Sequence, residues 1–335
     1  MRAAYIQELG PPDVIRYGEL PAPRPGPTDV LVDVLSTAVD PVDAFVRSGV
    51  FRTAVDFPFV IGRDLVGTVA RAGPGVTGFR AGDRVWCNSL GHEGRQGAAA
   101  EQAVVAADRL YPLPDGVDPD LAVAALHPAA TAYLALFVHG RLRLGETVLV
   151  AGAAGNVGSA LVTFAARAGA RVLATAAARD AGYCAESGAA EVFDYRDPEL
   201  TGRIRRAAPA GVDVYLDTAG VNDLETSVGL LARRGRVVLL AGAGTRPVLP
   251  AGPLYMNGGS VVGFVISHAT TVELATAATA VNDLLAQGLL RPRNVEVLPL
   301  DAAAEAHARM ENGELRGRRV VLRTDPTRPG PRPGP

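Results

Sequence analysis

The residues best suited to chemistry in this 335-residue chain form a glycine-rich turn between a strand-like run and a helix-like segment. The apolar run Val148–Ala151 is followed by Gly152-Ala153-Ala154-Gly155-Asn156-Val157-Gly158, and the Ala-rich segment 161–170 predicts a helix. This arrangement aims free backbone N–H groups at a pyrophosphate. Gly155 would let the backbone approach the phosphates, and Gly158 would let the helix pack close to the strand.

The turn lacks the first glycine of the usual dinucleotide fingerprint, because Ala153 stands in its place. A glycine-rich turn alone is a moderate signal, since such matches also arise by chance. Arg171–Ala176, however, supplies the next predicted strand at the spacing of a βαβ unit. The sequence therefore predicts a dinucleotide-binding domain.

The residues after this second strand favour NADPH over NADH. An NAD site usually places Asp or Glu at the end of that strand, whereas here Thr175 is followed by three alanines and Arg179. Arg179 could bind a 2′-phosphate through charge-assisted hydrogen bonds, and a carboxylate would repel that phosphate. Two alternatives stay open: Arg179 could be a solvated residue at a helix start, and Asp180 could reverse the preference.

Composition indicates a globular chain without nucleic-acid or membrane partners. The chain is 48% hydrophobic and 20% charged, with a net charge of −2. We expect no membrane span, because charges and glycines interrupt the apolar runs, and the N-terminus lacks a signal-peptide core. Cytoplasmic residence follows as the expectation. Cys87 and Cys184 are the only cysteines, and both are expected to be free. The chain has no lysine, so cationic chemistry must come from Arg, His or the N-terminus.

The pattern of elements predicts an α/β protein of two domains. Residues 1–122 hold many short strand-like runs broken by turn residues, which is typical of a barrel-like β domain. Residues 123–290 alternate strands with helices, which predicts a doubly wound parallel sheet. Segment 291–324 is expected to return to the first domain, and the Pro/Gly/Arg-rich tail 325–335 to be disordered. The candidate strands of the parallel sheet are 147–151, 171–175, 191–193, 213–216, 236–240 and 261–264.

Several segments, in order through about residues 1–323, resemble the medium-chain dehydrogenase/reductase superfamily. The branch they are similar to is that of zinc-independent quinone oxidoreductases (zeta-crystallin-like) and enoyl reductases. The resemblance implies a GroES-like β-barrel catalytic domain, a Rossmann domain, a cleft between them, a nicotinamide cofactor and a homodimer. Besides the glycine-rich turn, the segments that carry it are Val39–Gly49, Gly62–Val69, Gly78–Val85, Ala129–Tyr133 and Asp213–Gly220.

The turn and the resemblance together predict the residues that bind NADPH. Tyr195 matches a tyrosine that lines the adenosine phosphate pocket in the family, although it could serve packing alone. Ala241 and Gly242 are expected to present backbone groups to the nicotinamide carboxamide, and Phe264 and Val265 to pack near the ring. The full predicted set is Thr131, Ala153, Gly155, Asn156, Val157, Gly158, Thr175, Arg179, Tyr195, Ala219, Ala241, Gly242, Phe264 and Val265.

The resemblance also locates the positions of the catalytic zinc in metal-dependent relatives. Asp40 falls at the first ligand position, Arg63 at the second with Asp64 beside it, and His127 at the third. An obligate cation at Arg63 is a poor neighbour for Zn²⁺, so we predict no catalytic metal. A weak site formed by Asp40, Asp64 and His127 is the alternative, and it would need Arg63 to turn away.

Hydride transfer without a metal requires an acceptor that is already polarised, such as a quinone or an α,β-unsaturated carbonyl. The protein must still stabilise the resulting oxyanion and supply a proton. The family's tyrosines in the early loop are replaced here by Phe45 and Phe51, which with Tyr133 are the predicted substrate-pocket residues.

Two interpretations of the polar residues at the old metal site stay open. In the first, Asp40, Arg63, Asp64 and His127 form a structural ion-pair network. In the second, His127 or Asp40 donates the proton and Arg63 helps to hold the oxyanion, with Tyr133 a weaker alternative donor.

Three functions remain on the sequence alone. The first is NADPH-dependent reduction of a small-molecule quinone. The second is reduction of an enone or enoyl double bond, for example in secondary metabolism. The third, suggested by the loss of the phenolic donors, is a non-catalytic NADPH-binding protein.

Overall fold

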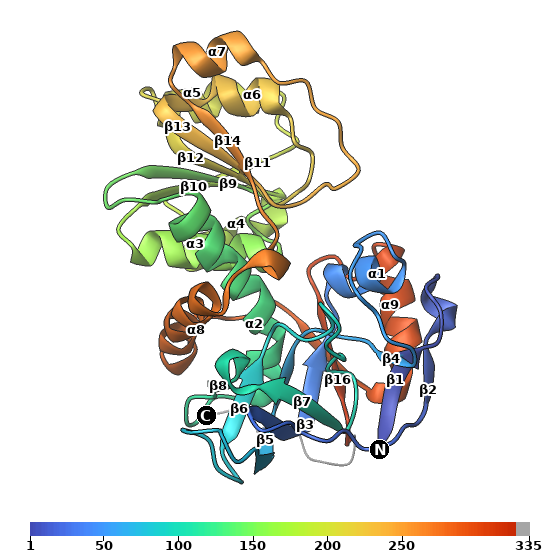
Figure 1. Cartoon of the computed structure of the whole chain (residues 1–335). Helices are drawn as coiled ribbons and strands as arrows, with labels where there is room; N and C mark the ends of the chain where they lie inside the picture. The colour runs from blue at the N-terminus through green and yellow to red at the C-terminus, as the bar shows by residue number, and fades with distance from the viewer. Residues whose placement is uncertain (326–335) are drawn as a thin grey trace. The chain divides into compact units, whose positions relative to one another are not determined.

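The computed structural model describes residues 1–325, and its contacts divide the chain into two compact units (Figure 1). Unit 1 comprises Met1–His127 and the chain from Thr270 on, and unit 2 comprises Pro128–Ala269. The predicted disordered tail, 325–335, lies outside the described residues except for its first residue.

Unit 1 holds two sheets built from short strands. A three-stranded sheet has the order β2-β1-β4, and a seven-stranded sheet has the order β15-β16-β3-β5-β6-β8, with β7 paired to β3. Valines at alternate positions of β3, Val30, Val32 and Val34, fill one apolar core of this unit. The strands are β1 (Arg2–Ile6), β2 (Arg16–Glu19), β3 (Asp29–Ala38), β4 (Phe59–Val60), β5 (Leu65–Ala72), β6 (Arg84–Cys87), β7 (Gln102–Ala106), β8 (Tyr111–Pro112), β15 (Val295–Pro299) and β16 (Arg319–Arg323).

The helices of unit 1 bring distant parts of the chain together. The α1 and α9 helices lie side by side (Figure 1), and the buried guanidinium of Arg47 on α1 pairs with Glu311 on α9. The strand β16 pairs with β3, so residues near the end of the chain reach the core of the first domain. The elements are η1 (Pro12–Val14), α1 (Pro41–Arg47), η2 (Ala107–Arg109), α2 (Pro119–Tyr133, whose later turns belong to unit 2), α8 (Thr271–Ala286), η6 (Leu300–Ala302) and α9 (Ala303–Glu311).

Unit 2 is the predicted doubly wound sheet, with six parallel strands in the order β11-β10-β9-β12-β13-β14. From β9 the chain runs outward through β10 to β11 and then returns to β12 on the other side of β9, so the strand order reverses at β9. The strands are β9 (Thr147–Ala151), β10 (Arg171–Ala176), β11 (Glu191–Asp194), β12 (Val212–Asp217), β13 (Leu231–Leu239) and β14 (Ser260–Gly263). The helical elements are η3 (Leu134–His139), α3 (Asn156–Arg167), η4 (Ala178–Asp180), α4 (Ala181–Glu186), α5 (Leu200–Ala207), α6 (Leu224–Gly229), α7 (Ala251–Met256) and η5 (Ile266–His268).

The expected mixed α/β architecture is confirmed, but the units differ from the boundaries expected at 122 and 290. The α8 helix belongs to unit 1 because its Asn282 bonds that unit twice. The Asn282 Oδ1 accepts a hydrogen bond from Trp86 Nε1 at 2.9 Å, and its Nδ2 donates to the Pro112 carbonyl at 2.9 Å.

One continuous helical stretch was not expected from the sequence. Pro119–His139, which joins α2 to the π-helical η3, is long and apolar enough to cross a membrane by length and composition. Of its apolar window, 78% is buried inside the structure, as in the core helix of a globular protein. The apolar character of this stretch is therefore explained by packing.

Candidate functional site

The glycine-rich turn joins β9 to α3 in the geometry of a phosphate cradle. Gly152 has φ 80°, and a Cβ on Gly158 would lie 2.2 Å from the Gly152 carbonyl oxygen, so only glycine lets the helix pack here. Gly155 is the N-cap of α3 and offers no capping side chain, which leaves the first-turn N–H groups open. Gly155 and Asn156 are exposed, and no acidic residue lies in this turn, so an anion can approach.

The structure brings Arg179 and Tyr195 to neighbouring strand ends. The pairing of Ala176 with Asp194 places the ends of β10 and β11 side by side. The Arg179 side chain is 74% exposed, and its Nε lies 3.7 Å from Asp180 Oδ1. An exposed cation at this edge fits a 2′-phosphate, although Asp180 competes for it.

Sequence reasoning did not assign a role to Arg196, which lies at the same edge. Its guanidinium sits 5.1 Å from the centre of the Tyr195 ring, and its Nη2 donates to the Tyr195 hydroxyl at 3.1 Å. The available signal was the cation directly after Tyr195. Arg196 therefore adds a second positive charge beside the residues predicted to bind the adenosine phosphate.

Other predicted cofactor residues of unit 2 differ in how accessible they are. Ala219 and Ala241 are exposed in the loops after β12 and β13, and Gly242 is half-buried. Ala153 is buried and donates to the Thr175 carbonyl at 3.0 Å, so this pair fixes the turn. Val157 and Val265 are half-buried.

Two further predicted cofactor residues are engaged or enclosed in unit 2. The Phe264 ring stacks on His139 with a centroid separation of 4.3 Å, so one of its faces is already covered. Thr131 is buried, and its Oγ1 has no hydrogen-bond partner among the described residues.

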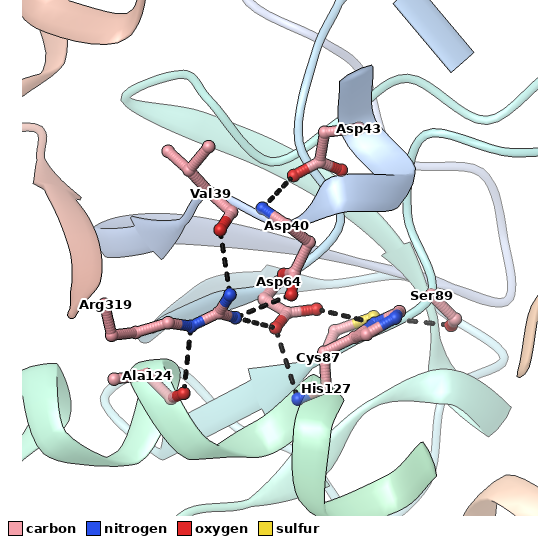
Figure 2. A network of polar contacts seen from close by, with 9 residues as sticks. All are labelled: Val39, Asp40, Asp43, Asp64, Cys87, Ser89, Ala124, His127 and Arg319. Atoms are coloured by element: carbon pink, nitrogen blue, oxygen red, sulfur yellow. Dashed lines mark hydrogen bonds and ion pairs between the residues drawn. The ribbon is translucent and has the colours of Figure 1, made fainter. Parts of the chain in front are cut away.

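Unit 1 holds a buried cluster of charged side chains around Arg319 (Figure 2). Arg319 Nη2 lies 2.7 Å from Asp40 Oδ1 and 3.8 Å from Asp64 Oδ2. Its Nη1 donates to the Val39 carbonyl at 2.8 Å and its Nε to the Ala124 carbonyl at 3.1 Å. The sequence predicts Arg63 as the cation of this network, whereas the guanidinium that contacts both carboxylates is that of Arg319.

The helix α2 is built so that it can accept this arginine. Pro128 lies inside α2 and has no N–H to donate to the carbonyl of Ala124, four residues earlier. Arg319 Nε supplies the missing donor. The proline therefore leaves an acceptor open next to the carboxylates.

His127 shares the same buried cluster through Asp64. Its Nδ1 lies 3.4 Å from Asp64 Oδ1, and its backbone N–H donates to Asp64 Oδ2 at 3.3 Å. The Asp64 carboxylate thus orients the imidazole from its Nδ1 side.

The charges of the cluster set opposite protonation tendencies in its members. Burial alone would raise the pKa of Asp40, but the charges of Arg319 and His127 outweigh it and lower that pKa. Burial, together with the charge of Asp40, raises the pKa of Asp64 to about 6. Burial would lower the pKa of His127, but Asp40 and Asp64 outweigh it and raise that pKa. Asp40 therefore stays ionised, and His127 and Asp64 share a proton.

Arg63 and Asp43 complete the cluster. Asp43 Oδ2 accepts the Asp40 N–H at 2.8 Å, and burial, aided by the charge of Asp40, raises the Asp43 pKa to about 8. Arg63 is 2% exposed, and its Nε and Nη2 have no hydrogen-bond partner among the described residues. A buried guanidinium with open donors can receive an oxyanion.

The predicted pocket residues belong to both units, with Phe45 and Phe51 in unit 1 and Tyr133 in unit 2. Phe45 is 41% exposed, and the Phe51 N–H donates to its carbonyl at 2.9 Å. The Phe51 ring lies 5.4 Å from the ring of His92. Tyr133 belongs to unit 2, where it packs 4.8 Å from Phe137, an arrangement that favours its packing role.

The three potential metal ligands do come together. Asp40, Asp64 and His127 each offer one ligand atom, and these atoms lie within 4.8 Å of one another. The guanidinium of Arg319 lies among them, however, and adds a positive charge where a cation would bind. Cys87 lies beside this group (Figure 2), but burial raises the pKa of its thiol. The donor set therefore does not fit Zn²⁺.

Comparison with known proteins agrees with this architecture. Residues 26–115 match the family model described as alcohol dehydrogenase GroES-like domain, and residues 156–281 match the one described as zinc-binding dehydrogenase. The quinone oxidoreductase of Mus musculus is 31% identical over 327 residues, which cover 96% of this chain and 97% of the mouse protein.

Solved structures agree as well. A mycobacterial quinone oxidoreductase is 31% identical with a TM-score of 0.83, covering 96% of this chain and 99% of that one. The Escherichia coli quinone oxidoreductase complexed with NADPH is 25% identical with a TM-score of 0.83, covering 96% and 100%. A GroES-like domain joined to a Rossmann domain defines a class of nicotinamide-dependent oxidoreductases. The chain belongs to the medium-chain dehydrogenase/reductase superfamily, in its quinone oxidoreductase branch.

Proposed function

We propose that this protein is an NADPH-dependent oxidoreductase that reduces a conjugated carbonyl compound, with a quinone as its acceptor. The observation that carries this proposal is the buried His127–Asp64 pair, whose Nδ1 and Oδ1 lie 3.4 Å apart, in an oxidoreductase fold. A proton held in a buried cluster is what the product oxyanion needs after hydride transfer.

NADPH fits the features of unit 2. The open N–H groups of α3 suit the pyrophosphate, and Arg179 and Arg196 suit a 2′-phosphate. Escherichia coli quinone oxidoreductase was solved with NADPH, which supports the same cofactor here. When bound, NADPH supplies the hydride, and the chain's own residues supply binding and protons.

His127 is the proton donor in this proposal, and Arg63 holds the oxygen on which negative charge develops. The proton leaves Nε2 of His127, while Asp64 keeps the ring oriented from the Nδ1 side. Asp40 is less suited to donate, because its lowered pKa keeps it ionised. The acceptor gains one hydride from NADPH and one proton from His127, and together these make up a balanced two-electron reduction.

We further infer that the reaction proceeds without a metal. The guanidinium of Arg319, 2.7 Å from Asp40, already neutralises the carboxylates that a cation would need. Polarisation of the acceptor must then come from the acceptor's own conjugation and from Arg63. This is the reason for proposing quinones or enones in place of simple alcohols and ketones.

Reduction of an enone or enoyl double bond is the second candidate. Phe45 and Phe51 stand where the family often has tyrosines, so the acceptor would meet an apolar wall without a phenolic donor. Hydride would add to the β-carbon, charge would spread onto the carbonyl oxygen, and the proton would complete the saturated product.

The test is NADPH consumption by metal-free protein with a panel of quinones, enones and enoyl thioesters, repeated with NADH. Turnover with quinones supports the first candidate, and turnover confined to enones or enoyl thioesters supports the second. A protein that binds NADPH but consumes it with none of them would instead fit a non-catalytic NADPH-binding role.

We also propose a cytoplasmic homodimer. The strand β14 pairs only with β13 among the described strands, and Tyr255 and Met256 of α7 are 72% and 77% exposed. An open strand edge and exposed apolar side chains are each suited to contact with a second copy. Light scattering on the purified protein gives the mass that decides this.

A further inference from the structure

Side chains of one short segment, Asp217–Asn222, tie together three loops at the carboxyl end of the parallel sheet. Thr218 Oγ1 donates to the Ala151 carbonyl at 2.7 Å and lies 3.1 Å from the Gly152 carbonyl, so it fastens the segment to the glycine-rich turn. Asp217 Oδ1 accepts the N–H groups of Ala219 and Gly220 at 2.8 and 2.9 Å. The segment is thereby rigid at its start and fixed to the turn after β9.

Asn222 fastens the same segment to the loop after β13. It has φ 54°, a left-handed conformation that Asn tolerates better than most residues. Its N–H donates to Asp217 Oδ2 at 2.6 Å. Its Nδ2 donates to the Ala241 carbonyl at 3.0 Å and to Thr245 Oγ1 at 2.7 Å.

The direction of these bonds is fixed by their partners. The Ala241 carbonyl can only accept, so the amino group of Asn222 must face it. Thr245 Oγ1 donates to the Gly242 carbonyl at 2.8 Å, which leaves its lone pairs free to accept from Asn222. Asn222 itself is 5% exposed, so these bonds are sheltered from water.

The two loops also touch directly. A Cβ added to Gly242 would lie 2.4 Å from the Gly220 carbonyl oxygen and 2.6 Å from Asn222 Nδ2. The loop 241–245 therefore cannot move toward or away from the segment without breaking the Asn222 bonds or colliding with Gly220.

We propose that Asn222 is a positioning residue that holds loop 241–245 for the nicotinamide half of NADPH. This inference rests on the proposed function, in which unit 2 binds NADPH. A dinucleotide lies across the strand ends with its pyrophosphate at the glycine-rich turn, and its adenosine half lies toward the second strand of the unit. That strand is β10, so β12 and β13, on the other side of β9, face the nicotinamide half.

The test compares two ligands on the full chain. Intact NADPH uses both halves of the site, whereas adenosine 2′,5′-bisphosphate uses only the adenosine half. In Asn222→Gly, which keeps the left-handed conformation, we expect the NADPH Kd to rise about tenfold, the loss expected for one or two hydrogen bonds. The Kd for adenosine 2′,5′-bisphosphate should stay within about twofold, since its contacts lie elsewhere.

Asn257→Gly is the matched control. Asn257 Nδ2 also donates to two carbonyls, Leu231 at 3.1 Å and Ala232 at 2.9 Å, but at the opposite end of β13. It should lower the Tm without changing the ratio of the two Kd values. A structural role alone for Asn222 would make the two variants behave alike.

If Asn222→Gly weakens the binding of both ligands equally, so that the ratio of the two Kd values is unchanged, the inference is overturned. If Asn222→Gly does not fold, Asn222→Asp and Thr245→Val replace it, and an unchanged ratio or failure to fold in both counts against the proposal. Failure of the unaltered protein to bind NADPH would instead overturn the proposed function. The two ideas are therefore separated by the same set of measurements.

Discussion

Arg319 and Asp40, 279 residues apart in the chain, form a buried ion pair at 2.7 Å in the interior of unit 1. Their side chains are 3% and 2% exposed, so neither charge can be satisfied by water. Breaking a buried pair leaves one uncompensated charge, which costs far more than the pair itself contributes.

We therefore expect Arg319→Met to lower the free energy of unfolding by about 3–5 kcal/mol, measured by urea denaturation. Arg171→Met is the control, because its pair with Glu191 has both side chains 43% exposed. That variant should change stability by about 0–1 kcal/mol. Arg319→Met combined with Asp40→Asn should recover part of the loss, and an unchanged loss would show that the charge balance was not the cause.

The second prediction concerns His127 as a proton donor. His127→Gln should lower turnover about 10²-fold, while the NADPH Kd stays unchanged, because the residue is not among those predicted to bind NADPH. In the unaltered protein, kcat/KM should fall as pH rises through the raised pKa of His127, since the donor must be protonated. The rate of NADPH oxidation, measured over a range of pH, gives both results. If kcat/KM of His127→Gln falls with rising pH in the same way, His127 is excluded as the group that causes the fall.

Cofactor selection provides the third prediction. Arg179→Ala should raise the NADPH Kd about tenfold or more and leave the NADH Kd nearly unchanged, because NADH has no 2′-phosphate. Arg196→Ala should act in the same direction. Arg203→Ala is the control, since this arginine is 47% exposed and pairs with Asp197. Titration of the cofactor fluorescence measures all four proteins, and equal losses for both cofactors would remove Arg179 from the phosphate site.

The fourth prediction is acid sensitivity from His307. Burial, with a further contribution from Arg47, lowers the pKa of this α9 histidine from 6.5 to about 3. Below pH 6.5 the unfolded chain takes up a proton that the folded chain refuses, so stability falls by about 1.4 kcal/mol per pH unit until the folded pKa is reached. Above pH 6.5 this group has no effect.

His307→Gln should therefore show a flatter loss of stability between pH 6.5 and 4.5 than the unaltered protein. Identical slopes in the two proteins would assign the acid sensitivity to the carboxylates instead.

Local patterns were sufficient to predict most of the fold. The apolar runs of β9 and β10 and the glycine turn between them follow rules of short range, and both strands lie where expected. The strand predicted over 236–240 begins earlier than expected, because β13 spans Leu231–Leu239.

The charged cluster could be predicted only in part. The family motifs predict Asp40, Arg63 and His127 at this site, but the cation that contacts both Asp40 and Asp64 is Arg319 and not Arg63. Arg319 lies in β16, which pairs with β3 although most of the sequence separates the two strands. No sequence pattern near Arg319 indicates that partner. Likewise, the Ala124 carbonyl is open to Arg319 because Pro128, four residues later in α2, has no N–H to donate to it.

The strand that carries Arg319 has a consequence for synthesis on the ribosome. Unit 2 is one continuous stretch, so all of it emerges before the last part of unit 1 is made. Until β16 emerges, Asp40 and Asp64 have no guanidinium from Arg319, and β3 lacks its β16 partner. The nascent chain can therefore complete unit 2 first, whereas unit 1 must wait until β16 has emerged.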